Sequence, residues 1–159
     1  MFCALLSGDD ALIEDFSEEI QSTFSGDVYK EVVDKNPEDI PLLLTLSEVV
    51  QPTEIGRGYL DELQRNVERL PQGDKMRKYS IISQILESIW NSDSDEIEDA
   101  IQDLLDYHDE LRNRTDGGHM IDNQFSIEVC AYVALSYRRG LHIRIESDGI
   151  PDNFYNIVL

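Results

Sequence analysis

The sequence predicts an all-α protein, either an antiparallel helical bundle or stacked helix pairs, with a short extended C-terminal arm. Apolar residues recur at helical spacing through most of the 159 residues. The one stretch that alternates like a strand, 141–147, has no second strand with which to form a sheet. Hydrophobic residues make up 41% of the chain, which is enough for a buried core despite a formal net charge of −20.

The domain organisation is predicted from length and from a weak repeat. The length is typical of a single helical domain, 1–159. An apolar helix, a polar break and an acidic amphipathic helix recur about every 40 residues, the range of stacked helix pairs. We expect such pairs near 2–24, 41–70 and 74–112, with a closing helix and arm at 123–159. Because identity between the copies is low, a plain bundle fits equally well.

The first two helices are predicted from stripes of apolar residues. Between 10 and 24 these residues fall on one face, which we expect to be buried, and Asp9 or Asp10 can cap its start. A second stripe runs from 41 to 50, where Pro41 suits a first-turn position. The apolar positions are Leu12, Ile13, Phe16, Ile20 and Phe24 in the first stripe, and Leu42, Leu43, Leu46, Val49 and Val50 in the second.

Two further helices are predicted in the middle of the chain. Thr53 can cap a segment whose apolar positions lie between 59 and 70. Residues 71–73 then predict a turn, after which Asp74 can cap the next helix. The apolar positions are Tyr59, Leu60, Leu63, Val67 and Leu70 in the first of these helices, and Met76, Tyr79, Ile82, Ile85, Leu86 and Ile89 in the second.

The segment NSDSDEIEDAI, 91–101, partly matches a calcium loop but is predicted to begin a helix. Asp93 and Asp95 have the first spacing of such a loop, yet its sixth position, which needs glycine, is Glu98. Acidic residues in a first helical turn instead complement the helix dipole. The apolar stripe of this helix is the clearest in the chain: Ile97, Ala100, Ile101, Leu104, Leu105, His108 and Leu111.

The chain closes with a loop, a buried helix and the arm. The run NRTDGGHM, 113–120, predicts the loop. The helix SIEVCAYVALSYRR, 126–139, is apolar on nearly every side, so we expect it to be central, with Gly140 at its C-terminal cap. In the arm, 141–147, every second residue is apolar and is expected to pack inward.

Structural roles are assigned to the cations that surround the end of this helix. Arg138 and Arg139 lie in its last turn, where positive charge meets the negative end of the helix dipole. Gly140 ends the helix, and Arg144 is expected on the outer side of the arm. In so acidic a chain, we expect these arginines to pair with carboxylates of neighbouring helices and to fix the arm in place.

The sequence predicts no catalytic residue, metal site or cofactor. Cys3 and Cys130 lie far apart within apolar runs and are expected to be small buried residues. The histidines His108, His119 and His142 make no metal-ligand spacing with one another. His108 falls on the apolar stripe and is expected at an interior or boundary position. Motifs of a serine nucleophile, a P-loop or a dinucleotide site are absent from the sequence.

The charge balance predicts the kind of partner. Asp plus Glu number 33 against 13 Lys plus Arg, which excludes broad contact with nucleic acid and disfavours anionic membranes. Such a surface speeds association with a basic protein, although it also serves solubility. The carboxylates that we expect to bind a partner are the densest group: Asp93, Asp95, Glu96, Glu98, Asp99, Asp103, Asp106, Asp109 and Glu110.

The sequence favours a cytoplasmic location. Its start lacks the pattern of a signal peptide, and no apolar run approaches the roughly 20 residues that span a membrane. The abrupt apolar start, helix-like by Phe2, leads us to expect that the natural protein begins further upstream. The oligomeric state stays open.

Two segments carry a family resemblance: EIEDAIQDLLDYHDE and IDNQFSIEVCAYVALSYRRGLHIRIESDGIP. They combine an acidic helix, a loop, an apolar helix ending in VALSYRRG, the alternating HIRIES and a closing proline. In these features the last third of the chain resembles the Immunity protein 49 family of bacterial polymorphic-toxin systems. The resemblance implies an all-α protein that binds and neutralises a toxin.

We therefore expect a bacterial immunity protein, not an enzyme, that occludes the basic active surface of a cognate toxin, of nuclease type. Electrostatic steering would give the fast capture that such a protein needs. An alternative is an acidic adaptor or nucleic-acid mimic that inhibits a DNA-binding enzyme, for example one encoded by a phage. A hydrolase that uses a pair of carboxylates is a third class. The gene neighbourhood separates the first two, because a toxin gene favours immunity and a phage operon favours the mimic.

Overall fold

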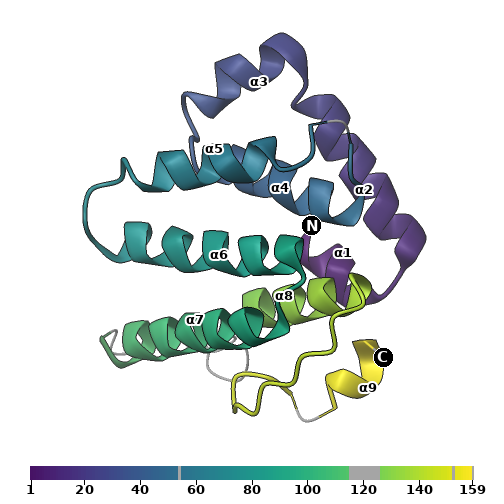
Figure 1. The fold of residues 1–159 in the computed structure, drawn as a ribbon, viewed down its shortest axis with the longest axis vertical. Helices are drawn as coiled ribbons and strands as arrows, with labels where there is room; N and C mark the ends of the chain where they lie inside the picture. The colour runs from purple at the N-terminus through teal and green to yellow at the C-terminus, as the bar shows by residue number, and fades with distance from the viewer. Residues whose placement is uncertain (54, 115–125, 152, 159) are drawn as a thin grey trace.

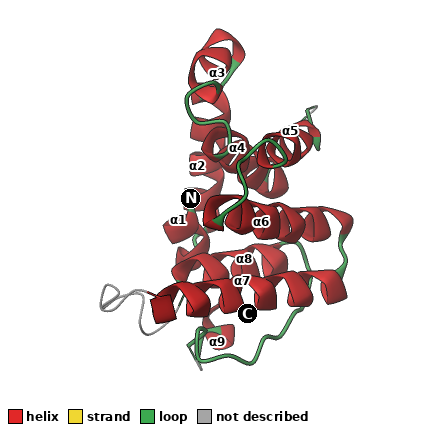
Figure 2. Ribbon diagram, turned by 90° about the vertical axis from the view of Figure 1, so that its left-hand side faces the viewer, coloured by secondary structure: helices red, strands yellow, loops and turns green. Residues whose placement is uncertain are grey.

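The computed structural model describes residues 1–53, 55–114, 126–151 and 153–158, and every regular element within these ranges is an α-helix. The predicted all-α class is therefore confirmed (Figures 1 and 2). His119 and most of the predicted loop lie outside the described residues. The helices are α1 (Phe2–Ser7), α2 (Asp10–Thr23), α3 (Gly26–Val33), α4 (Asp39–Val50), α5 (Gly58–Val67), α6 (Asp74–Asn91), α7 (Ser94–Arg114), α8 (Ile127–Arg138) and α9 (Tyr155–Val158).

The helices pack in layers with α6 in the middle. Helices that follow one another from α4 to α7 are neighbours in space, as short connections between antiparallel helices require. Figure 1 shows α4 and α5 on one side of α6, and α7 and α8 on the other. The N-terminal helix α1 packs against α8, and α2 packs against α4. The α3 helix projects from this body at the end of α2 in both views (Figures 1 and 2).

The last long helix, α8, lies at the centre of the core, as the sequence predicts. Every residue from 129 to 136 is buried, and one hydrophobic cluster joins residues from Ala4 to Phe154. The apolar stripe of α7 packs into the same cluster. An apolar helix can only be stable where other helices cover all its sides, so α8 fixes the positions of its neighbours.

The predicted helix starts are partly right. Asp9 caps α2, because one of its carboxylate oxygens accepts a hydrogen bond from the Leu12 amide at 3.2 Å. Thr53 does not cap α5, which begins at Gly58. Instead both the amide and the hydroxyl of Thr53 donate to the buried carboxylate of Glu48 at the end of α4. A buried carboxylate needs donors, and Thr53 supplies them.

Two other expectations about helix starts and burial are corrected. Asp74 is the first residue of α6 and makes no capping hydrogen bond, because Gly73 occupies the cap position. Cys3 is exposed, since the short α1 turns Ala4 and Leu5 into the core; Cys130 is buried as expected. The α3 helix was not predicted from the sequence; it is amphipathic, and none of its residues is buried.

The apolar face predicted for α2 is wrong in detail. The structure buries Ile13 and Ser17, whereas Leu12 and Phe16 are each 39% exposed. The Ser47 hydroxyl on α4 donates to the backbone oxygen of Ser17 at 2.9 Å. Two small side chains at this contact let the helices approach closely, which turns the larger side chains outward.

The arm at 141–147 is extended but forms no strand, because side chains take the place of a partner strand. The Tyr137 hydroxyl donates to the backbone oxygen of Ile143 at 2.8 Å. The Tyr155 hydroxyl accepts from the amide of Ile145 at 2.8 Å and donates to its carbonyl at 3.1 Å. Both isoleucines are buried, as predicted, so their backbone groups depend on these hydroxyls.

We predict that Tyr155→Phe destabilises the fold by about 1 to 3 kcal/mol, the cost of leaving buried backbone groups without partners. Tyr59→Phe is the matched control, because the Tyr59 hydroxyl forms no hydrogen bond within the described residues. Urea unfolding of both variants measures the difference. Equal stability of the two variants would contradict this description of the arm.

Candidate functional site

The exposed side of α7 carries a stripe of carboxylates. At 3.6 residues per turn, six of them fall within about 100° of the helix circumference and extend over about 22 Å. The apolar residues of α7 occupy the opposite side and are buried. All six carboxylate residues are exposed. We call this set the acidic stripe: Asp95, Glu96, Asp99, Asp103, Asp106 and Glu110.

Most of the acidic stripe is not used by the fold. The side chains of Asp95, Asp99 and Asp103 make no hydrogen bond or ion pair within the part of the chain that the structure describes. Asp106 accepts one hydrogen bond, from Gln102 on the same helix. Unpaired carboxylates this close repel one another, so a cation from outside would relieve them.

The other predicted partner-binding residues lie off the stripe and have structural contacts. Asp93 caps α7 by accepting from the Glu96 amide at 3.2 Å. Glu98 is half-buried and accepts from the amide of Arg144 in the arm at 3.0 Å. Asp109 pairs with Arg112 one turn away. These three carboxylates are therefore less available to a partner.

At its C-terminal end the stripe meets α6 through Glu110. Glu110 pairs with Arg77 of α6 and with Arg114 of α7. The hydrogen bond from Arg77 lowers the pKa of Glu110, and the same bond raises the pKa of Arg77. The guanidinium of Arg77 also lies 5.6 Å from the centre of the Tyr107 ring. This network ties the two longest helices together.

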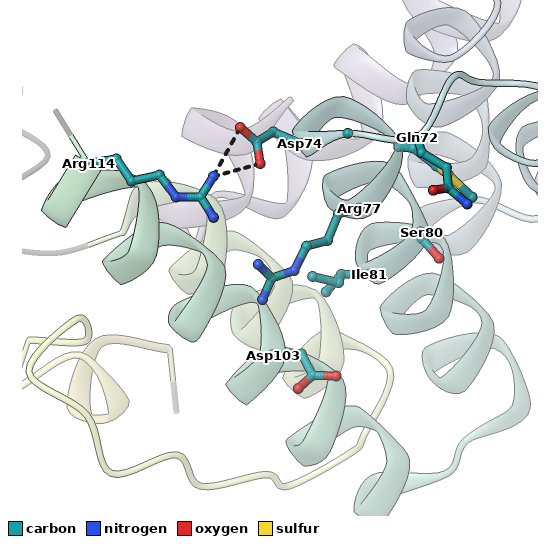
Figure 3. A pocket seen from close by; sticks show the side chains of 9 residues that line it. Gln72, Asp74, Arg77, Ser80, Ile81, Asp103 and Arg114 are labelled. Atoms are coloured by element: carbon teal, nitrogen blue, oxygen red, sulfur yellow. Dashed lines mark hydrogen bonds and ion pairs between the residues drawn. The ribbon is translucent and has the colours of Figure 1, made fainter.

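A shallow hollow opens beside this network, between α6 and α7 (Figure 3). Arg77 and Arg114 line it together with Asp74 and Asp103. Arg114 pairs with Asp74 at 3.0 Å, so the protein's own carboxylates already neutralise both arginines. An anion would have to displace these pairs, and the hollow therefore lacks the chemistry of a phosphate site.

The cations at the end of α8 divide into two groups. Arg138 forms ion pairs with Asp10 and Glu14 of α2, so it joins α8 to a neighbouring helix. Arg139 and Arg144 are exposed, and the structure gives neither an ion pair within the described ranges. Of the three arginines, only Arg138 forms the expected ion pairs within these ranges, and these pairs join α8 to α2, not to the arm. Gly140 has a φ of 76°, the left-handed conformation that ends a helix.

A polar cluster that the sequence analysis missed joins α6, α7 and α8. The two ring nitrogens of His108 lie 3.0 Å from the Ser126 hydroxyl and 3.3 Å from the Glu128 carboxylate. Lys78 also pairs with Glu128 at 3.0 Å. The Ser126 hydroxyl accepts from the Val129 amide and so caps α8. The boundary position expected for His108 is confirmed.

One signal in the sequence could have revealed this cluster. Glu128 is the only charged residue of the buried helix before Arg138, and a lone charge in such a helix needs partners. Burial raises the pKa of Glu128, but hydrogen bonds and charge from His108 and Lys78 outweigh this effect, and the net pKa is lowered. The cluster holds the start of α8 between its neighbours.

The described residues also lack the features of a metal site or a membrane span. They contain no group of three or more metal-binding side chains, and none of their helices is long and apolar enough to cross a membrane. Burial raises the pKa of the Cys130 thiol to about 11, which keeps it in the unreactive protonated form.

Comparison with known protein families gives a match over most of the chain. The model of the family described as Immunity protein 49 matches residues 1–154. The match extends through the N-terminal helices as well as the last third in which the sequence resemblance was seen. No curated protein and no solved structure matches the chain.

We predict that Glu128→Gln lowers the free energy of unfolding at pH 7 by about 1 to 3 kcal/mol, because a charged hydrogen-bond acceptor is lost. The pKa of Glu128 is lower in the folded state than its ordinary value of 4.5. Its contribution is therefore present above about pH 4.5 and is lost as the pH falls through the folded-state pKa.

The difference between the wild type and this variant should accordingly shrink below about pH 4.5. Urea unfolding at several pH values measures it, with Glu68→Gln as the control at an exposed carboxylate. A difference that stayed constant down to about pH 3, roughly 1.5 units below the ordinary pKa of 4.5, would contradict the role given to the Glu128 charge.

Proposed function

Because the chain belongs to the Immunity protein 49 family, we propose that it protects a bacterial cell by binding a cognate toxin and blocking its active surface. The family match supports an immunity role for the chain. The toxin, the surface that it presents and the cytoplasm as the place of capture belong to the proposal. The protein acts by occlusion and performs no chemistry itself.

The observation that carries the mechanism is the acidic stripe. Asp95, Asp99 and Asp103 are exposed and form no hydrogen bond or ion pair within the described residues, so they can pair with cations of another protein without breaking such a bond. The net charge of −20 attracts a basic protein over a distance of about one Debye length, roughly 8 Å in physiological salt. Such attraction raises the association rate, which determines how much toxin escapes capture.

The class of toxin follows from the same charge. A nuclease binds a polyanion, so its active cleft is lined with cations. A rigid helix that presents carboxylates along about 22 Å can lie against such a cleft in place of the nucleic acid. We therefore propose a nuclease-type toxin. The family match favours this function over that of an acidic inhibitor of another DNA-binding enzyme.

The direct test mixes the purified protein with the toxin encoded beside its gene. We expect a stable complex on size-exclusion chromatography and loss of toxin activity in proportion to the protein added. In cells, production of the protein should restore growth when the toxin is expressed. A toxin that stays active and unbound at micromolar protein would overturn the proposal.

We predict that the triple variant Asp99→Asn, Asp103→Asn and Asp106→Asn slows association with the toxin by about tenfold at low salt, because it removes charge from the contact surface. Glu31→Gln, Asp34→Asn and Glu68→Gln form the control, since they remove the same charge from exposed positions away from α7. Stopped-flow or surface plasmon resonance gives both rates. Equal slowing by the two variants would show that only net charge matters and that the stripe is not the contact.

A further inference from the structure

The side chains Leu12 and Phe16 form an apolar pair on the surface of α2. They lie one helical turn apart, so they point to the same side, and each is 39% exposed. Ile20 and Phe24 continue the same row and are half-buried. Single exposed apolar residues are common, but two on adjacent turns at the head of an apolar row form a surface that could contact another protein.

The other exposed large hydrophobic residues that the structure describes do not form such a pair. Val28, Ile55 and Ile127 lie on three different segments. The α2 helix is also the right-hand edge of the molecule in Figure 1, whereas the acidic stripe belongs to α7 at the lower left. The apolar pair is therefore separate from the stripe.

The charges around the pair specify its partner. Residues 1–29 contain no Lys, Arg or His. Asp15 and Glu19 lie on the outer flank of the apolar row, both exposed, and their carboxylates make no contact within the described ranges. An apolar pair with unpaired carboxylates along one flank fits an apolar pocket edged by cations.

A second copy of this chain does not meet that requirement, because two such faces would bring unpaired carboxylates together in a chain of net charge −20. A basic protein does. We propose that the exposed face of α2 is a second contact surface for the toxin, with Phe16 and Leu12 seated in an apolar pocket between basic side chains. That the partner is a toxin rests on the proposed function. That the partner offers an apolar pocket edged by cations rests only on the residues of α2.

The acidic stripe and the α2 surface would affect different rate constants of toxin binding. Charged contacts at the edge of an interface mainly set the association rate. Desolvated aromatic and aliphatic side chains usually supply the long residence time, and the acidic stripe contains none. Phe16 offers such an anchor, because its ring can be covered without exposing any buried group.

The test compares Phe16→Ala and Leu12→Ala with Ile127→Ala for binding to the toxin encoded beside the gene. Ile127 is the matched control, because it is 38% exposed and lies on another helix. We expect Phe16→Ala to raise the dissociation rate constant by about 30-fold, the effect of a hot-spot residue, and Leu12→Ala to raise it by about 5-fold, the smaller effect of a supporting contact. Ile127→Ala should change it less than twofold. Thermal unfolding should show that all three variants stay folded.

The outcomes separate this inference from the proposed function. If the wild type binds the toxin and Phe16→Ala dissociates no faster than Ile127→Ala, the α2 surface is refuted while the immunity function stands. If the wild type does not bind the toxin, the proposed function fails, and the partner assigned to α2 fails with it. Sedimentation of the protein alone gives a further check, because a dimer that Phe16→Ala dissociates would show that a second copy covers this face.

Discussion

The burial of α8 is the constraint on which the rest of the structure depends. All its residues from 129 to 136 are shielded from water, in a chain that carries 33 acidic residues. Its neighbours must therefore give their apolar sides to α8 and turn their carboxylates outward. The carboxylate that precedes this buried run, Glu128, is stable there because Lys78 and His108 accompany it. The outer helices therefore carry apolar side chains on the side that faces the core and charged side chains on the other side.

The acidic stripe on α7 is a consequence of this segregation. The helix gives one side to α6 and α8 and leaves the other without apolar residues. The fold uses the carboxylates at its ends, where Asp93 caps the helix and Glu110 joins α6. Within the described residues it leaves Asp99 and Asp103, in the middle of the helix, without a hydrogen bond or ion pair. A surface that contributes so little to stability can change to suit a binding partner. For a member of an immunity protein family, that partner is a toxin.

The sequence predicted best those helices whose apolar pattern allows only one buried face. The stripe of α7 and the uniformly apolar α8 could only be buried as they are. The face of α2 could not be predicted, because Ser17 and Ser47 set the contact with α4, and a pair of serines gives no signal in a hydrophobic pattern. The sequence predicted Thr53 as a helix cap. In the structure it binds the buried carboxylate of Glu48 instead, and this contact could not be predicted because the burial of Glu48 depends on the fold. The cluster around His108 was not predicted, because its residues come from three helices that lie far apart in the sequence.

The central claim is that the acidic surface captures a basic toxin, and the dependence of the association rate constant on ionic strength tests it most directly. The measurement uses the wild-type protein and the toxin encoded beside its gene, from about 50 mM to about 300 mM salt. Screening shortens the reach of the carboxylates over this range, so the rate constant should fall steeply, by about tenfold or more. A rate constant that stays the same at both ends of the range would contradict the account.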